Sequence, residues 1–286
     1  MPLLSILQDT PAFFISFVAI IGLMIGSFLN VVIYRLPEMM KRNWLQQCAE
    51  LHGEAGKALP TLNLITPRSV CTHCGHKITV WENIPIVSYL ILLGRCSQCH
   101  ANISLRYPIV EAVTALMSGF VAWYYGYGLI TIAVLIFVWA LIALAVIDLN
   151  TQLLPDDITM PLLWMGLLIN MNSGFTDIQS AIIGAVAGYL SLWSIYWCFK
   201  LSTGKEGMGY GDFKLLSAIG AWLGWNMLPL VMLSSSLVGA TVGIGLVLTT
   251  RLKKSTPIPF GPYLVGGAFI ALFWGEKLNY IYHGLF

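Results

Sequence analysis

Charged residues are scarce in this chain of 286 residues. Asp, Glu, Lys and Arg together make up 10% of the sequence, whereas hydrophobic residues make up 57%. A soluble globular domain usually contains about 25% charged residues. The composition therefore excludes an ordinary soluble domain and indicates a polytopic membrane protein.

Other features are also missing. There is no Lys or Arg before Arg35, and the first apolar run, 13–34, is longer than that of a secretory signal peptide. We therefore expect the first segment to be retained as a transmembrane helix. The sequence has no basic stripe with interleaved aromatic residues, so it gives no sign of nucleic-acid binding. It also lacks low-complexity segments and internal repeats.

Long apolar runs are what the sequence does have. A transmembrane helix needs about 20 apolar residues, and eight runs approach that length, although two are short. They cover residues 13–34, 108–125, 129–147, 158–171, 178–198, 213–226, 228–250 and 262–284. The predicted fold is an all-α polytopic membrane protein with about eight transmembrane helices.

The basic residues predict the orientation. Because they begin only at the far end of the first run, its N-terminus should lie on the non-cytosolic side. Carried through eight helices, this orientation leaves only Lys277 of the 15 basic residues on that side. The cytosolic ones are Arg35, Lys41, Arg42, Lys57, Arg68, Lys77, Arg95, Arg106, Lys200, Lys205, Lys214, Arg251, Lys253 and Lys254. The positive-inside rule thus supports both the helix count and the orientation.

Residues 35–107 form the one sizeable polar insertion, so we divide the chain into 1–34, 35–107 and 108–286. The insertion has too few apolar residues to build a large core and needs another source of stability. Its run 84–94 is too short to cross the bilayer. We expect this run either to pack within the cytosolic domain or to lie against the membrane surface.

Four of the six cysteines form two Cys-x-x-Cys pairs in this insertion, Cys71 with Cys74 and Cys96 with Cys99. Each pair offers two thiolates to one ion, so the spacing predicts a tetrahedral structural zinc site. Gly75 suits the tight turn that follows Cys74. Zinc binding would supply folding free energy that a small domain lacks.

Several alternatives to a structural zinc remain. The four cysteines could form two disulfides, which need an oxidising compartment, or stay as reduced thiols without metal. A catalytic zinc would need only three protein ligands, so four cysteines favour a closed site. The nearby histidines could replace a ligand, but we expect them to be solvated loop residues: His73, His76 and His100. Cys48 and Cys198 lack partners and should be inert buried or interfacial thiols.

Two aspartates stand at the edges of apolar runs, Asp148 after 129–147 and Asp212 before 213–226. A carboxylate at the edge of a membrane span is costly and indicates a functional site. The predicted topology brings both to the cytosolic side at the same depth. Two carboxylates held close together share a proton, so one can activate a water while the other donates to a carbonyl oxygen.

Each aspartate also has a purely structural interpretation. Asp212 could be a helix N-cap, and Asp148 could be a helix-end carboxylate hydrogen-bonded at the interface. Three glycines precede Asp212 and would let an extended peptide approach closely: Gly207, Gly209 and Gly211. A Gly-x-Gly-Asp element alone is weak evidence for a protease.

Other acidic residues compete with this pair. Asp156 and Asp157 lie in the same predicted turn as Asp148, but they follow Pro155 where a helix cap belongs, so we predict that one of them caps the run 158–171. Glu111 and Glu206 are either polar groups that line a site or interfacial charges, and we favour interfacial charges.

Taken together, these segments are similar to one known family. They are GSFLNVVIYRLP (26–37), the four-cysteine loop, RYPIVE (106–111), AVIDLNTQLLPDDITMPLLW (145–164), GMGYGDFKLL (207–216) and PFGPYL (259–264). Over nearly its whole length the chain resembles the bacterial type IV prepilin peptidases. These are bifunctional leader peptidases and N-methyltransferases of the Gly-x-Gly-Asp aspartic protease class.

The resemblance implies a specific function. Asp148 and Asp212 would be the catalytic pair, Gly209 and Gly211 the motif glycines, and the four-cysteine loop a zinc site. The enzyme would lie in the bacterial inner membrane with a periplasmic N-terminus, surrounded by lipid. It would cleave the basic leader of prepilins and pseudopilins after a glycine on the cytosolic face, and then methylate the new N-terminal amine with S-adenosylmethionine. The methyl donor's ligands are not indicated, because the sequence has no glycine-rich nucleotide-binding fingerprint.

Two other functions remain as alternatives. A membrane protease of the presenilin or signal-peptide-peptidase kind would share the Gly-x-Gly-Asp element. Those proteins have Tyr-Asp in the first motif and a Pro-Ala-Leu segment, whereas this chain has Ile147-Asp148 and PFGPYL at 259–264. A proton-coupled transporter could use the two aspartates as a relay, but it would not explain the four-cysteine loop.

Overall fold

The computed structural model describes residues 7–52, 62–250 and 259–284. In these three segments the structure is helical and contains no β-strand, only two isolated bridges, Val70 with Lys77 and Arg95 with Asn102. The all-α prediction is therefore confirmed. The chain divides into two compact units, unit 1 (Met1–Trp139) and unit 2 (Ala140–Phe286).

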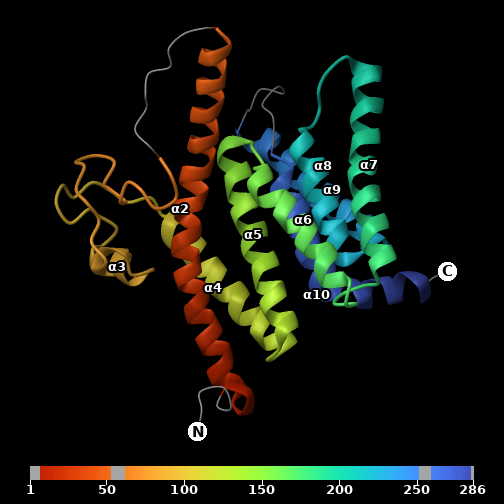
Figure 1. Cartoon of the computed structure of the whole chain (residues 1–286), viewed down its shortest axis with the longest axis horizontal. Coiled ribbons are helices and arrows are strands. Elements are labelled where there is room, and N and C mark those ends of the chain that lie inside the picture. Colours follow the sequence, from red (N-terminus) through yellow and green to blue (C-terminus); the bar gives the residue numbers. More distant parts are fainter. Residues whose placement is uncertain (1–6, 53–61, 251–258, 285–286) are drawn as a thin grey trace. The chain divides into compact units, whose positions relative to one another are not determined.

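Unit 1 is built on two helices that pack along each other, α2 (Pro11–Leu51) and α4 (Arg106–Tyr125) (Figure 1). Small residues on α2 allow the close approach. A Cβ at Gly26 would lie 2.8 Å from the Cα of Glu111, so only glycine fits there. Helix α2 has 41 residues and continues through Pro37, well beyond the apolar run that predicted it.

Hydrogen bonds fasten the polar insertion to α2. The buried Arg35 donates to the carbonyl oxygens of Asn63 at 2.9 Å and Pro67 at 2.6 Å. Asn30 donates from Nδ2 to the Tyr107 carbonyl oxygen at 3.1 Å, where α4 begins. The stretch 63–67 and the end of the insertion are thereby held against one stretch of α2.

The insertion itself contains the short helices η1 (Trp81–Asn83) and α3 (Val87–Ile91). Helix α3 has five residues, which agrees with the prediction that the run 84–94 does not cross the bilayer. The Glu111 carboxylate accepts the N–H of Ile86 at 2.8 Å and is buried. Interpreting Glu111 as an interfacial charge was therefore wrong, because it closes a hydrogen bond between α4 and the start of α3.

Unit 2 contains the second half of α5 (Leu129–Thr151) and the helices that follow it. They are α6 (Asp156–Asn170), α7 (Ile178–Thr203), α8 (Tyr210–Leu223), η2 (Trp225–Met227), α9 (Leu228–Thr250) and α10 (Gly261–Gly284). Helix α8 packs against α6, α7, α9 and α10 (Figure 1).

Helix α8 is the core of unit 2. Its largest side chains, including Phe213, Leu216 and Trp222, are fully buried. The α8 and α7 backbones touch where glycines face each other: a Cβ at Gly184 would lie 2.3 Å from the Gly220 carbonyl oxygen. A helix buried this tightly cannot shift easily, so its first turn holds Asp212 in a fixed place.

Among the described residues, four helical segments are long and apolar enough to cross a membrane: Pro11–Leu51, Leu129–Thr151, Ile178–Thr203 and Trp225–Gly245. The protein is thus a multi-pass membrane protein. The four remaining predicted runs lie on α4, α6, α8 and α10, which do not combine that length with that apolarity. The predicted topology also relied on Lys57, Arg251, Lys253 and Lys254, which lie outside the described residues.

Candidate active site and metal centre

The two predicted acids come together in unit 2. Asp148 lies in the last turn of α5 and Asp212 in the first turn of α8, and both side chains are buried. The Asp148 carboxylate is near enough to that of Asp212 for direct electrostatic repulsion between them. The chain just after α5 lies against the start of α8, since a Cβ at Gly211 would lie 2.8 Å from the Cβ of Leu154.

Asp148 is held by the start of α10. Its Oδ2 accepts the backbone N–H of Gly261 at 2.9 Å, which leaves its second carboxylate oxygen for other partners. A Cβ at position 261 would lie 2.7 Å from that same Oδ2, so any side chain there would displace the carboxylate. Sequence reasoning quoted the segment 259–264 but gave Gly261 no role. A glycine between two bulky residues, Phe260 and Pro262, was the available signal.

Asp212 is not the N-cap of its helix. Gly209 occupies that position, with no side-chain cap, and accepts the Asp212 N–H at 3.2 Å through its carbonyl oxygen. The structural interpretation of Asp212 as a cap is therefore wrong. Its Oδ1 is buried and has no hydrogen-bond partner among the described residues. An unpaired buried carboxylate oxygen is costly, and a substrate group or a water would satisfy it.

The glycines before Asp212 allow close packing. A Cβ at Gly211 would lie 2.8 Å from the Cβ of Leu154, and one at Gly207 would lie 2.9 Å from the Phe199 ring. Around Gly209 the nearest atom to such a Cβ is Asp212 Oδ2, at 3.9 Å. Gly211 thus serves the packing of α8 against the chain after α5, whereas Gly209 leaves space beside the carboxylate.

Asp156 and Asp157, the alternatives to Asp148, are not part of the acid pair. Asp156 is exposed and accepts from Lys214 Nζ at 2.7 Å. The N-cap of α6 is Pro155, and no side chain caps that end. The prediction that Asp156 or Asp157 caps the helix is therefore wrong, because α6 begins at Asp156 and places both acids inside its first turn.

The glycine-rich loop is fastened to α7. Lys200 donates from Nζ to Glu206 Oε1 at 2.8 Å and to the Tyr196 hydroxyl at 3.1 Å. The Lys200 ammonium lowers the pKa of Glu206 below its usual range. The Tyr196 ring lies 5.4 Å from that of Tyr210, the first residue of α8. Glu206 is thus one half of an ion pair rather than a lone interfacial charge.

Unit 1 brings the four predicted metal ligands together. The sulfurs of Cys71, Cys74, Cys96 and Cys99 all lie within 4.8 Å of one another. Around a zinc ion with Zn–S bonds of about 2.3 Å, tetrahedral sulfurs are about 3.8 Å apart, and Cys71 and Cys99 are separated by 3.8 Å. None of the six cysteines, all of which are described, forms a disulfide. The cluster can hold a metal ion.

The two cysteine loops have the same backbone design. The Gly75 N–H donates to the Cys71 carbonyl oxygen at 2.9 Å, and the His100 N–H donates to that of Cys96 at 3.0 Å. Gly75 has φ of 73° and His100 has φ of 56°, so both adopt the left-handed conformation after their second cysteine. The prediction of a tight turn at Gly75 is confirmed, and the second loop makes the same turn without glycine.

Negative charge is unevenly distributed over the thiols. The N–H groups of Cys74 and His73 lower the pKa of Cys71 to about 6. The Ala101 N–H also lowers the pKa of Cys99, but burial and the neighbouring thiols outweigh it and raise that pKa to about 11. The four sulfurs therefore cannot all ionise readily by themselves. A divalent cation would remove that repulsion, so the donor set fits a bound metal.

Glu82 links the two cysteine loops. It pairs with His76 Nε2 at 3.2 Å beside the first loop and accepts from the Ser97 hydroxyl of the second. The Ser97 hydroxyl, followed by the Thr79 N–H, lowers the pKa of Glu82 to about 2. His76 is half-buried by this pairing, so the expectation of a solvated loop histidine was wrong for it. Sequence reasoning missed Glu82, although Thr79 and Glu82 form a Ser/Thr-x-x-Glu capping pattern.

The remaining cysteines are ordinary surface residues. Cys48 and Cys198 were expected to be buried or interfacial; both are exposed, so burial within the protein is excluded for them. Cys198 lies on α7, one of the apolar helices long enough to cross a membrane, where an exposed thiol can face lipid.

Comparisons with known proteins match almost the whole chain. The bacterial Peptidase A24 N-terminal domain matches residues 20–125, and the Type IV leader peptidase family matches residues 135–244. A protein from Pseudomonas aeruginosa named prepilin leader peptidase/N-methyltransferase is 52% identical over 283 residues, which cover 99% of this chain and 98% of that protein.

Relatives of the same name come from other bacteria. The one from Aeromonas hydrophila is 54% identical over 279 residues, covering 97% of this chain and 96% of that protein. The one from Burkholderia pseudomallei strain 1026b is 46% identical and covers 94% of this chain and 88% of that protein. No solved structure matches the chain. The chain belongs to the type IV leader peptidase family.

Proposed function

We propose that this protein is a membrane aspartic endopeptidase that removes the leader of type IV prepilins and pseudopilins and then methylates the new N-terminal amine. The relatives that carry the name prepilin leader peptidase/N-methyltransferase support both activities. The observation that carries the peptidase assignment is the meeting of two buried aspartates, one with an unpartnered oxygen.

The roles of the two acids follow from their surroundings. Two buried carboxylates that repel each other can share one proton. The ionised member takes a proton from a water, whose oxygen then attacks the scissile carbonyl carbon. The protonated member gives its proton to the carbonyl oxygen. The Gly261 N–H fixes the orientation of Asp148 during these steps, and the free Oδ1 of Asp212 is a place for the water or the substrate.

The substrate's chemistry suits a site at the membrane edge. A prepilin has an apolar helix after its basic leader, so its cleavage point lies where lipid meets cytosol. The space beside Gly209 would let an extended peptide reach Asp212 closely. Glu206 could attract the basic leader, although its charge is already balanced by Lys200.

The proposed topology has eight transmembrane helices in the bacterial inner membrane, with a periplasmic N-terminus and the acids at the cytosolic face. It divides the chain into 1–34, 35–107 and 108–286. The distribution of basic residues supports it. In the cytosolic domain, the thiolates of Cys71, Cys74, Cys96 and Cys99 would bind one structural zinc ion, which holds the two cysteine loops together.

The second activity needs S-adenosylmethionine, which supplies the methyl group. We propose that it binds in the cytosolic domain together with the adjacent segment 26–30. The names of the relatives support its use. The new N-terminal amine, freed by cleavage at the same membrane face, is the methyl acceptor.

One experiment tests this function. Purified protein in detergent is incubated with a prepilin, with and without S-adenosylmethionine, and wild type is compared with Asp148→Asn, Asp212→Asn and the control Asp157→Asn. We expect each active-site substitution to lower the rate of cleavage by about 10²-fold or more. Methylation of a precleaved substrate should persist. Asp157→Asn, which is exposed and outside the pair, should cleave normally. Full cleavage by both active-site variants would contradict the proposal.

A further inference from the structure

Helix α3 exposes an apolar face that no described residue of unit 1 covers. Val87, Leu90 and Ile91 follow the i, i+3, i+4 spacing of one helix face and are 48%, 65% and 75% exposed. Leu93, just beyond the helix, is 85% exposed. The opposite face points inward, where the Tyr89 hydroxyl contacts the Ile103 carbonyl oxygen at 3.5 Å. A contiguous apolar face of this kind marks an interaction site.

The position of α3 along α2 indicates what that site meets. Ile86, which precedes α3, donates to Glu111, whose Cα lies against Gly26 of α2. Ile86 is therefore within one glutamate side chain and one hydrogen bond of Gly26. Arg35, the first basic residue, is about 13 Å further along the helix at 1.5 Å per residue. The start of α3 thus lies beside the apolar run 13–34 of α2. It is closer to the middle of that run than Arg35 is.

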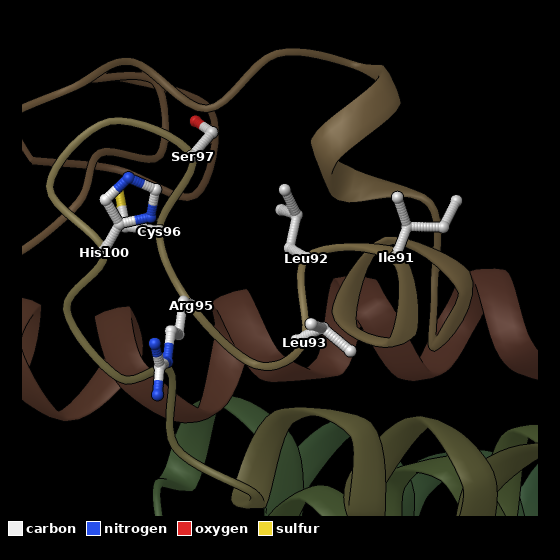
Figure 2. A pocket seen from close by; sticks show the side chains of 7 residues that line it. All are labelled: Ile91, Leu92, Leu93, Arg95, Cys96, Ser97 and His100. Carbon is white, nitrogen blue, oxygen red and sulfur yellow. The ribbon is translucent and has the colours of Figure 1, made fainter.

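A shallow hollow next to α3 is apolar on one side and polar on the other (Figure 2). Ile91, Leu92 and Leu93 form one side of it, and the polar loop from Arg95 to His100 forms the other. Arg95 and His100 are exposed. An apolar wall beside a polar one that carries the cation Arg95 matches the boundary between lipid acyl chains and phosphate headgroups.

We propose that α3 is an interfacial membrane anchor: its Val87, Leu90, Ile91 and Leu93 face inserts into the acyl boundary of the bilayer, and Arg95 contacts lipid phosphate. The partner is the lipid of the leaflet from which α2 emerges at Arg35. In the proposed orientation of the protein, this is the cytosolic leaflet. Amphipathic segments of this kind bury their apolar face about 5–10 Å into the interface.

The anchor would hold the cysteine loops at the membrane surface. The second loop begins at Cys96, three residues after Leu93. The start of α3 is tied to α4 through Glu111. A lipid-bound α3 therefore fixes the metal centre at the depth at which α4 begins.

A fluorescent noncanonical amino acid placed at one position at a time in the full-length protein tests the anchor, in nanodiscs of phosphatidylethanolamine and phosphatidylglycerol. Leu90 and Ile91 are the test positions. Met24, exposed on the apolar part of α2, is the lipid-facing control, and Leu51, exposed at the far end of the same helix, is the aqueous control. Quenching by nitroxide-labelled lipid is compared with quenching by iodide in the buffer.

We expect labels at Leu90 and Ile91 to lose most of their fluorescence to the nitroxide lipid and little to iodide, as at Met24, and the label at Leu51 to show the opposite. Quenching by iodide alone at Leu90 and Ile91 would overturn the anchor. Quenching by neither would also overturn it and would show that protein covers this face. The measurement does not involve cleavage, so its outcome for the anchor is independent of the peptidase assignment.

Discussion

In unit 2, Asp148 and Asp212 come from two helices that are far apart in the sequence, and they meet inside a tightly packed core. In unit 1, the four cysteines come from two short loops, and three of the four are not buried. The acids are held by helix packing and by glycines that permit contact. The cysteines are held by local turns and by the Glu82 link between the loops.

This contrast has a physical consequence. Buried helices keep their arrangement through the hydrophobic contacts of many residues. Two loops with few apolar contacts need another source of free energy, which a bound metal ion would supply. The acid pair should therefore tolerate loss of metal, and the cysteine loops should not.

Metal removal gives the largest expected effect. Stripping the protein with a chelator in nanodiscs should abolish amide hydrogen-exchange protection in residues 68–105, because the two loops then lose the ion that would hold them together. Protection of α8 should stay unchanged, since its core contains no metal ligand. Mass spectrometry of peptides from both regions reports the two outcomes. Unaltered protection of 68–105 after complete metal loss would show that the cysteines are not structural.

The substitution Gly261→Ala should have the second-largest effect, on the rate of cleavage. Its methyl group would lie 2.7 Å from Asp148 Oδ2, so the carboxylate must move, and a misplacement of about 1 Å can cost about 10²-fold in rate. The measurement is kcat/KM for prepilin cleavage. Gly266→Ala on the same helix is the matched control, because a Cβ there meets nothing within 4 Å. Equal activity of the two variants would show that Gly261 does not position Asp148.

Glu82→Gln should weaken the cysteine loops without unfolding unit 2. The neutral amide keeps the shape but loses the charge-assisted hydrogen bonds to Ser97 and His76. Loss of a group that supports metal ligands typically lowers metal affinity about 10–100-fold, which competition with a chromogenic chelator measures. Glu50→Gln, at the exposed end of α2, is the control. Identical zinc affinity in both variants would show that the link between the loops is not energetically important.

Glu206 should give the smallest effect. Its ion pair with Lys200 is exposed, and such pairs contribute little, so Glu206→Gln should change kcat/KM for cleavage less than about fivefold. Glu206→Lys places a cation beside Lys200 and should raise KM for a basic leader further while leaving a leader with fewer basic residues less affected. Unchanged cleavage of the basic leader by Glu206→Lys would exclude Glu206 from leader attraction.

Local patterns in the sequence were enough to predict the cysteine cluster. Two Cys-x-x-Cys pairs specify which side chains can share an ion, since each pair is one turn of chain. Apolar run lengths likewise indicated a helix at every predicted position. They did not settle how many of these helices cross the membrane, because helices of unit 2 such as α8 are buried in the protein and need not meet lipid.

The cap prediction for Asp156 or Asp157, and the alternative in which Asp212 caps its helix, failed for a different reason. Asp156, Asp157 and Asp212 all stand near helix starts, where an acid can be either a cap or a first-turn residue. Pro155 and Gly209 took the cap positions instead. A shift of one or two residues at a helix end is decided by packing, which composition does not report.

The sequence by itself determined the membrane class of the protein, its helices and the four cysteines that can hold a metal ion, because each depends on residues that are close together in the chain. Only the tertiary structure decided that Gly261 holds Asp148, that Glu82 joins the cysteine loops and that α3 presents an apolar face beside the apolar run of α2. These contacts depend on which distant backbones can approach each other, and that is set by the packing of whole helices.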